Sequence, residues 1–335
     1  MFTPETLKKE LNAPKHIVVT THHKPDGDAL GSSLAIYHWL KAKGHVVYVI
    51  VPSDFPIFFD WLPGRQDVKI YMEDKSANDA LIADADMIFC LDFNGLARIN
   101  AMEQAVRSAA GTKIMIDHHL EPEGFDDYRH WDSGAAASAQ LVYDFIVDVM
   151  DDHQAITLDM ATCLYTGIMT DTGSFRFRTT TSSVHSIVAD LITLGAKNWE
   201  IHEHVYNSFS ENHLKFLGFC LLNRLEVLHE YHTALFSISR QDLNRFQTTT
   251  GDTEGLVNYA LAISGMKLAA LIIDRTEQVK LSLRSVGDFP CNEVCKKYFN
   301  GGGHRNASGG NSNEPLDKVV EQFKSILPEY KERLT

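Results

Sequence analysis

The sequence lacks any long apolar run, any segment rich in lysine and arginine, and any closely spaced pair of cysteines. No stretch approaches the roughly 18 to 20 apolar residues that a membrane span requires. The first residues, MFTPETLKKELNAPK, contain no apolar core of the kind that defines a signal peptide. We therefore expect neither membrane insertion nor export.

The five cysteines form an odd, scattered set without a CxxC spacing. This pattern favours a reducing, cytoplasmic environment. The net charge is −13, from 31 basic and 44 acidic residues, so the protein repels a long polyanion. Long duplex DNA or RNA is therefore not an expected partner. A small anion remains compatible with this charge, because bound divalent cations can reverse the local potential.

Length and composition are sufficient for two domains, with 335 residues of which 44% are hydrophobic. From residue 16 to about 120, short β-branched-rich runs alternate with helix-length segments, which predicts an α/β domain. Its sheet should be parallel, with helices on both faces. We place this domain at residues 1–185, a helical connector at 186–230 and a smaller α+β domain at 231–335.

Metal-binding residue types occur where the apolar runs end. His22, Asp92 and His118 each follow or close one of these runs. Because ligands bind beyond the carboxyl ends of parallel strands, we expect the three side chains on one rim of the sheet. The segment HHKPDGDALGSS adds Asp26 and Asp28, and its proline and glycine allow both carboxylates to face one site. A turn with helix-capping aspartates is the alternative for this segment taken alone.

The tripeptide DHH at 117–119 is the most specific feature, because adjacent histidines behind an acid are rarely needed for packing. Asp171, in TGIMTDTGSFRF, adds a carboxylate. Four carboxylates and two imidazoles match the charge of two divalent cations, and oxygen with imidazole ligation favours Mn²⁺. Mg²⁺, Fe²⁺, Co²⁺ and Zn²⁺ stay open. The predicted metal ligands are His22, Asp26, Asp28, Asp92, His118 and Asp171.

Five ordered segments resemble the DHH phosphoesterase superfamily. HHKPDGDALGS is similar to its first motif, MIFCLD to its second, IDHH to its third and TGIMTDTGSF to its fourth. After the connector, SLRS followed by GGGHRNASGG resembles the DHH-associated domain of the nanoRNase/oligoribonuclease (NrnA-like) branch. The resemblance therefore covers nearly the whole chain.

The resemblance implies two metal ions that share a bridging carboxylate. One ion would be held by His22, Asp26 and Asp92, and the other by Asp28, Asp92, His118 and Asp171. His119 would donate to the substrate phosphate, and Asp117 would orient the histidines. The C-terminal domain would bind the substrate through Arg284, Gly301, Gly302, Gly303, His304 and Arg305. The glycines can also expose consecutive amides as an anion-binding nest.

The implied activity is metal-dependent hydrolysis of short single-stranded oligonucleotides to mononucleotides, together with removal of phosphate from 3′-phosphoadenosine 5′-phosphate. Hydrolysis of cyclic di-AMP or its linear product pApA is the alternative within the same chemistry. A family II pyrophosphatase shares the N-terminal motifs, but the GGGH segment argues against it. The exonuclease RecJ carries a further domain for which this chain has no room. A nucleotide-binding regulator without turnover is the alternative of another class, and a homodimer is left open.

Overall fold

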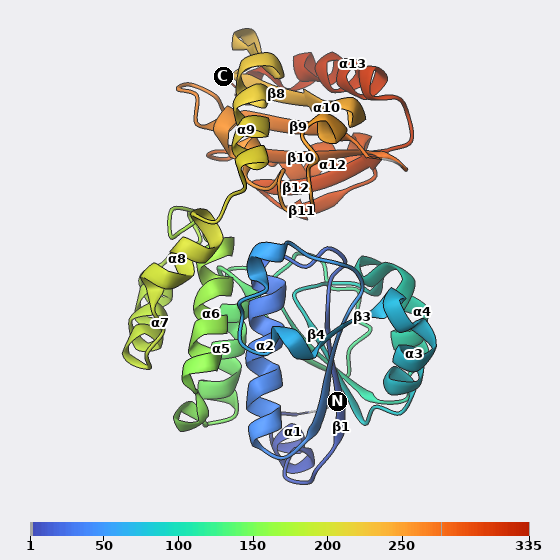
Figure 1. Ribbon diagram of the computed structural model, residues 1–335, viewed down its shortest axis with the longest axis vertical. Helices are drawn as coiled ribbons and strands as arrows, with labels where there is room; N and C mark the ends of the chain where they lie inside the picture. Colours follow the sequence, from blue (N-terminus) through green and yellow to red (C-terminus); the bar gives the residue numbers. More distant parts are fainter. Residues whose placement is uncertain (1–2, 276, 335) are drawn as a thin grey trace. The chain divides into compact units, whose positions relative to one another are not determined.

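The computed structural model describes residues 3–275 and 277–334 (Figure 1). The chain forms two compact units, Met1–Ser208 and Phe209–Thr335. The segment expected as a connector, 186–230, contributes to both of them. Within the described part of the chain, every helix is too short or too polar to span a lipid bilayer.

The first unit is built on a parallel sheet, which confirms the predicted α/β fold. Its six strands run in the order β3-β2-β1-β4-β5-β6, and all neighbours are parallel. Strands β1, β2, β4 and β5 lie on the predicted apolar runs HIVVTT, VVYVIV, MIFCLD and KIMID, whereas β3 and β6 are short edge strands that the pattern did not mark. The strands are β1 His16–Thr21, β2 Val46–Val51, β3 Val68–Ile70, β4 Met87–Leu91, β5 Thr112–Asp117 and β6 Tyr128–Trp131.

Helices cover both faces of this sheet (Figure 1). Helices α2 and α5 pack on one face, with α6 against both of them and α7 against α6. The apolar residues of α3 and α4 complete the core on the other face. The helices are α1 Pro4–Glu10, α2 Gly27–Ala42, α3 Lys75–Ala83, α4 Glu103–Ser108, α5 Ser138–Asp144, α6 Leu158–Asp171, α7 Ser182–Thr193 and α8 Asn198–Tyr206. Shorter turns are η1 Ile57–Phe59, η2 Arg65–Asp67, η3 Tyr71–Asp74, η4 Leu96–Met102, η5 Phe145–Val149 and η6 His153–Ala155.

Glycines bring α2, α5 and α6 unusually close together. A Cβ atom on Gly31 would lie 2.4 Å from the Cys163 carbonyl oxygen of α6. A Cβ atom on Gly167 would lie 2.6 Å from the Ala139 Cβ and 2.9 Å from Oδ1 of Asp28. Since such distances exclude any side chain, the two glycines allow the backbones that carry acidic residues to meet.

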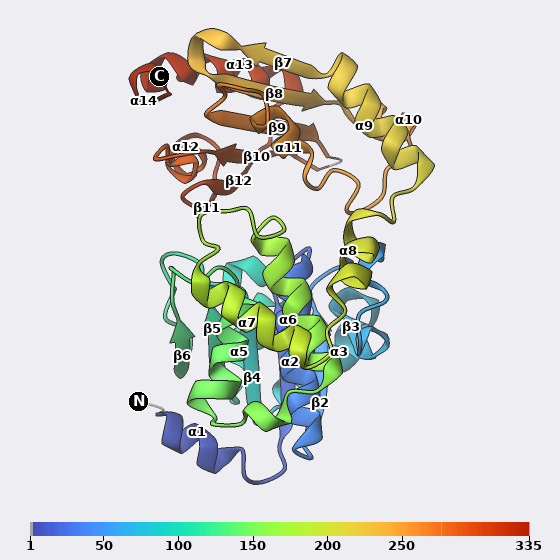
Figure 2. The same cartoon turned by 90° about the vertical axis from the view of Figure 1, so that its left-hand side faces the viewer.

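The second unit has a mixed sheet of six strands in the order β11-β12-β10-β9-β8-β7 (Figure 2). Neighbours are antiparallel except β8 and β9. The predicted α+β fold is confirmed, and the apolar segments HTALFSIS, AALIID and QVKLSLRS, which the pattern marks as strands, form β8, β9 and β10. The strands are β7 Leu225–Leu228, β8 Thr233–Ile238, β9 Leu268–Asp274, β10 Val279–Ser285, β11 Gly302–His304 and β12 Ala307–Ser312.

Helices also pack on both faces of the second sheet. Residues of α9, α10 and α11 form one core with the sheet, and those of α12, α13, η8 and α14 form the other. These elements are α9 Glu211–Asn223, η7 His229–Tyr231, α10 Arg240–Arg245, α11 Leu256–Leu261, α12 Cys291–Tyr298, α13 Leu316–Ile326, η8 Leu327–Tyr330 and α14 Lys331–Leu334.

Candidate metal centre

The first unit brings all six predicted ligand side chains together at the carboxyl end of its sheet. His22, Asp92 and His118 follow β1, β4 and β5, three strands that are neighbours in the sheet. Asp26 and Asp28 lie at the start of α2, and Asp171 is the last residue of α6. The close packing of α2 on α6 therefore brings these three aspartates next to the ligands at the strand ends.

Asp92 lies between the two imidazoles and faces each with a different oxygen. Its Oδ2 is 3.4 Å from Nε2 of His22, and its Oδ1 is 3.5 Å from Nε2 of His118. Atoms that share an ion at roughly 2.1 Å in octahedral geometry lie about 3 Å apart, so these spacings suit common ligation. The arrangement is that of a carboxylate able to bridge two cations.

Each imidazole also faces further carboxylates. Nε2 of His22 is 3.8 Å from Oδ2 of Asp26. Nε2 of His118 is 3.8 Å from Oδ2 of Asp28 and 3.4 Å from Oδ2 of Asp171. Ligand atoms of His22, Asp26 and Asp92 all lie within 4.8 Å of one another, and so do those of Asp28, Asp92 and His118. The structure thus forms two acidic clusters around one shared aspartate.

Hydrogen bonds at Nδ1 leave the Nε2 atom of both imidazoles for a metal. Nδ1 of His22 donates to the carbonyl oxygen of His23 at 3.0 Å, and Nδ1 of His118 donates to that of Ala135 at 3.2 Å. A metal-bound histidine needs this tautomer, because the coordinating nitrogen must be unprotonated. The donor set therefore fits a pair of divalent cations.

Asp26 combines the two roles that its sequence left open. Its Oδ1 caps α2 by accepting from the amides of Asp28 and Ala29, at 3.1 and 3.0 Å. Its Oδ2 points to His22, as described above. Capping and ligation use different oxygens, so the capping interpretation does not compete with the metal interpretation.

The start of α5 supports two of the aspartates, and sequence reasoning missed this contribution. The amides of Ser138 and Ala139 donate to Asp28 at 2.6 and 2.8 Å, and the Ser138 hydroxyl donates to Oδ1 of Asp92 at 2.9 Å. The segment GAAASAQ carries no motif for this role, because two of the three donors belong to the backbone. Helix α5 therefore fixes Asp28 and Asp92 through contacts that only the fold creates.

The buried charges shift the ionisation of these groups in opposite directions. Burial raises the pKa of Asp28 well above its usual range, and the neighbouring Asp92 and Asp171 raise it further. For Asp92 the effect of burial is outweighed by hydrogen bonds with His118 and His22, which hold its pKa well below the usual range. Burial is likewise outweighed at His22, whose pKa rises to about 10 because of Asp26 and Asp92. The site therefore favours positive charge among its carboxylates.

His119 and Asp117 form a separate pair beside the two clusters. Nδ1 of His119 donates to Oδ1 of Asp117 at 2.8 Å and lies 3.6 Å from Oδ1 of Asp92. Asp117 is fully buried. It was expected to orient both histidines; in the structure it holds His119, while the Ala135 carbonyl holds His118. Burial lowers the pKa of His119, and the charge of Arg98 lowers it further.

The predicted substrate-binding residues gather on one sheet of the second unit. Arg284 of β10 and His304 of β11 both pair with Ala307 of the intervening β12. Residues paired in register point to the same face, so the two side chains flank Ala307 on one side of the sheet. Arg305 lies at the tip of the hairpin, where its guanidinium donates to the Asp288 carbonyl at 2.9 Å.

The glycines of GGGHRNASGG form part of a hairpin rather than a free loop. The amide of Gly301 donates to the Cys295 carbonyl at 3.2 Å, and Gly302 and Gly303 pair with β12. A Cβ atom on Gly301 would lie 2.0 Å from the Gly309 carbonyl oxygen. Close strand approach therefore requires glycine here, and the expected nest of three free amides is not formed.

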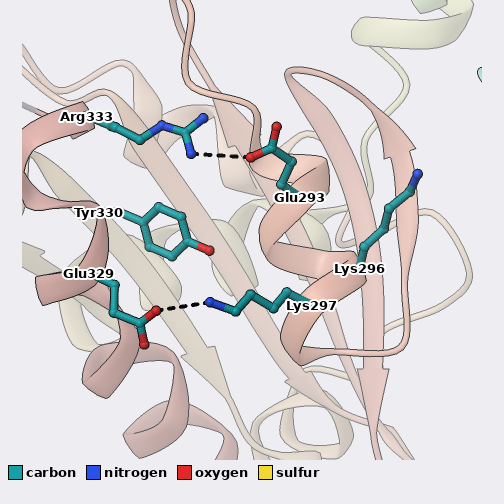
Figure 3. Close-up of a pocket in the computed structure, with 6 residues that line it drawn as sticks. All are labelled: Glu293, Lys296, Lys297, Glu329, Tyr330 and Arg333. Atoms are coloured by element: carbon teal, nitrogen blue, oxygen red, sulfur yellow. Dashed lines mark hydrogen bonds and ion pairs between the residues drawn. The ribbon is translucent and has the colours of Figure 1, made fainter.

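A shallow depression of about 560 Å³ on the second unit is a different kind of surface (Figure 3). Two of its cations have acidic partners: Lys297 lies 3.1 Å from Glu329, and Arg333 lies 3.3 Å from Glu293. These paired charges and the ring of Tyr330 line it without a histidine or an aspartate. The depression therefore offers no imidazole, and its carboxylates already face cations of the protein.

Comparison with known proteins agrees with the division of the chain into two units. Residues 16–168 match the DHH family, N-terminal domain, and residues 232–334 match the DHHA1 domain. The bifunctional oligoribonuclease and PAP phosphatase NrnA of Thermus thermophilus is 30% identical, over 95% of this chain and 90% of that protein. The protein of the same name from Bacillus subtilis is 26% identical, over 94% and 95%.

Solved structures extend the likeness. An exopolyphosphatase-related protein from Bacteroides fragilis has a TM-score of 0.93 and 39% identity, covering 99% of this chain and 97% of that one. RecJ from Thermus thermophilus, solved with Mn²⁺, has a TM-score of 0.51 and 13% identity, covering 99% and 54%, which shows a shared fold. The matching domains in this order, together with a relative 30% identical over nearly its whole length, show that the chain belongs to the DHH phosphoesterase family.

Proposed function

We propose that this protein hydrolyses the phosphodiester bonds of short single-stranded oligonucleotides and releases mononucleotides, using two divalent cations, with Mn²⁺ as the favoured ion. We further propose that it removes phosphate from 3′-phosphoadenosine 5′-phosphate. The observation that carries the proposal is Asp92, whose two oxygens face two imidazoles at 3.4 and 3.5 Å. The names of the Thermus and Bacillus relatives support the substrate class.

The ligands would be divided between the ions as the two clusters suggest. His22, Asp26 and Asp92 would hold one ion, and Asp28, Asp92, His118 and Asp171 the other. When bound, such a pair supplies an activated hydroxide and charge neutralisation for phosphoryl displacement. Ser138 and the start of α5 would keep Asp28 and Asp92 in place while charge develops.

His119 would contribute a hydrogen bond to the substrate phosphate. Its Nδ1 proton is used for Asp117, so donation from Nε2 requires a second proton on the ring. A phosphate placed against Nε2 favours that protonation, because it adds negative charge beside the imidazole. Asp117 would both fix the ring plane and stabilise the imidazolium. This role parallels that of a carboxylate behind a catalytic histidine.

The second unit would bind substrate through Arg284, His304 and Arg305. A guanidinium can grip a phosphate through two donors, and the imidazole adds a third. Gly301, Gly302 and Gly303 would serve by allowing the tight hairpin that presents His304. With a net charge of −13 and no extended basic track, a substrate of a few nucleotides fits better than a long strand.

The test is Mn²⁺-dependent hydrolysis of a 5′-labelled dinucleotide by the wild type and by Asp92→Ala. We expect the variant to lose at least about a hundredfold in kcat/KM, because both ions lose a ligand. Asp159→Ala is the matched control, since this exposed acid lies on α6 away from the clusters and its loss should leave activity unchanged. Circular dichroism spectra would verify that both variants fold.

A panel of substrates would separate the alternatives. We would compare pApA, cyclic di-AMP, 3′-phosphoadenosine 5′-phosphate, pyrophosphate and tripolyphosphate in one assay. The inorganic substrates are included because a relative 39% identical is described as exopolyphosphatase-related. Equal activity of wild type and Asp92→Ala would refute the metal assignment, and a wild type that binds nucleotides without turnover would indicate the regulator.

A further inference from the structure

Trp131 lies beside the candidate catalytic histidine and is tied to its backbone. It closes β6, where it pairs in register with Asp117 of β5. Its indole N–H donates to the carbonyl oxygen of His119 at 2.7 Å. This bond fixes the edge of the indole ring next to His119, so the ring has a defined place at the rim of the sheet.

The ring is exposed in spite of its size. Trp131 retains 39% of its surface accessible, whereas Trp39 of the same unit is fully buried. Strand β6 stands at the end of the strand order, so it has a neighbour on one side, β5. An indole held by its N–H and open to solvent leaves an aromatic surface available for a ligand, whereas a core tryptophan uses its surface for packing.

We propose that Trp131 stacks on the nucleobase next to the phosphate bound at the metal centre, and thereby selects nucleotides over inorganic phosphate chains. The inference rests on the proposed function. Every nucleobase has a flat π surface, so stacking tolerates any sequence. A chain with net charge −13 gains little affinity from long-range attraction of a polyanion, which gives a local stacking contact more weight.

A positioning role through His119 is the competing explanation, and two substitutions separate it from stacking. Trp131→Phe keeps an aromatic surface but removes the N–H that bonds to the His119 carbonyl. Trp131→Leu removes both. Trp199→Leu is the matched control, because Trp199 on α8 is 58% exposed and belongs to neither cluster.

The first measurement is KM and kcat with Mn²⁺ for pApA and for the same molecule with both bases replaced by hydrogen. We expect Trp131→Leu to raise KM for pApA roughly 5- to 100-fold, which is the range of one stacked base. Trp131→Phe should keep most of the affinity, and KM for the abasic substrate should be unchanged in all variants. Equal losses for Phe and Leu, or equal losses on the abasic substrate, would overturn the stacking role.

The second measurement is binding without turnover. A dinucleotide whose scissile ester oxygen is replaced by methylene is titrated while tryptophan fluorescence is followed. Stacking predicts quenching in the wild type and in Trp199→Leu that is lost in Trp131→Phe, because the stacked indole is the emitter. Quenching that persists in Trp131→Phe would refute the inference. The two proposals can be distinguished. If the dinucleotide binds with quenching that depends on Trp131 but pApA is not hydrolysed, the proposed function is wrong while the stacking of Trp131 on the base is supported.

Discussion

Replacing Ser138 by alanine would remove one hydroxyl group from the wall of the metal centre. This hydroxyl donates to Oδ1 of Asp92 at 2.9 Å, and both residues are buried. The backbone amide of Ser138, which donates to Asp28 at 2.6 Å, remains after the substitution. The change therefore weakens the support of the shared aspartate and leaves the support of Asp28 in place.

The expected magnitude follows from the charge of the acceptor. A hydrogen bond to a charged group contributes about 1.5 to 3 kcal/mol, and burial prevents water from replacing the lost donor. We assume that this free energy is lost from metal binding. Because about 1.4 kcal/mol corresponds to a factor of ten, the affinity for the metal should be roughly 10- to 100-fold weaker. Loss of an outer hydrogen-bond partner of a metal ligand typically has an effect of about this size.

The assay is calorimetric titration of metal-free protein with Mn²⁺, for wild type, Ser138→Ala and Ser33→Ala. Ser33 is the matched control, because it is fully buried in α2 and its hydroxyl has no hydrogen-bond partner. We expect Ser33→Ala to bind Mn²⁺ as the wild type does. Wild-type affinity in Ser138→Ala, or the same loss in both variants, would contradict the role given to the Ser138 hydroxyl.

Two further predictions concern stability. Burial and the neighbouring Asp148 raise the pKa of Asp144 from 3.8 to about 6, so its carboxylate destabilises the folded state above pH 6 and not below pH 4. Asp144→Asn should therefore stabilise the protein by about 1 to 2 kcal/mol at pH 8, a value reduced for the partial exposure of the side chain. Thermal unfolding of the wild type and the variant at pH 8 and pH 4 tests this. An equal gain in stability at both pH values would contradict it. Gly167→Ala should destabilise it by about 1 to 3 kcal/mol, because the new methyl group meets Ala139 and Asp28. In denaturant unfolding, Gly218→Ala on α9 is the control, since nothing lies within 4 Å of its added Cβ and a gain is expected.

The strand-end ligands could be predicted because topology alone places them together. In a parallel sheet with helical crossovers, residues that follow successive buried strands share one edge whatever the loops do. His22, Asp92 and His118 follow β1, β4 and β5, which are adjacent in the sheet. Asp26 and Asp28 could be predicted as well, because they flank Gly27 at the start of the helix that follows β1. The buried central strands were predicted for the same reason, as continuous apolar runs.

Other features could not be predicted, because they depend on packing between distant segments. Ser138 reaches Asp92 across 46 positions of sequence, and the contact exists because glycines let α2, α5 and α6 approach. The edge strands β3 and β6 contain three and four residues, too few for a periodic pattern. Trp131, on one of them, had no signal in the sequence that would distinguish it from a surface residue.

The sequence predicted that the total charge of the ligands matches two divalent cations. It did not predict how exposed each charged side chain would be. The side chain of Asp26 is 48% exposed, whereas those of Asp28 and His118 are 1% and 5% exposed. Water therefore screens Asp26 in the first cluster, whereas Asp28 in the second is buried and depends on the amides of Ser138 and Ala139. Asp171, at 32%, is the more exposed ligand of that second cluster. An ion beside Asp28 repays a larger desolvation cost, because water hardly screens that carboxylate. The two cations, although equal in formal charge, would occupy unequal sites, and the one beside Asp28 depends most on the support that α5 provides.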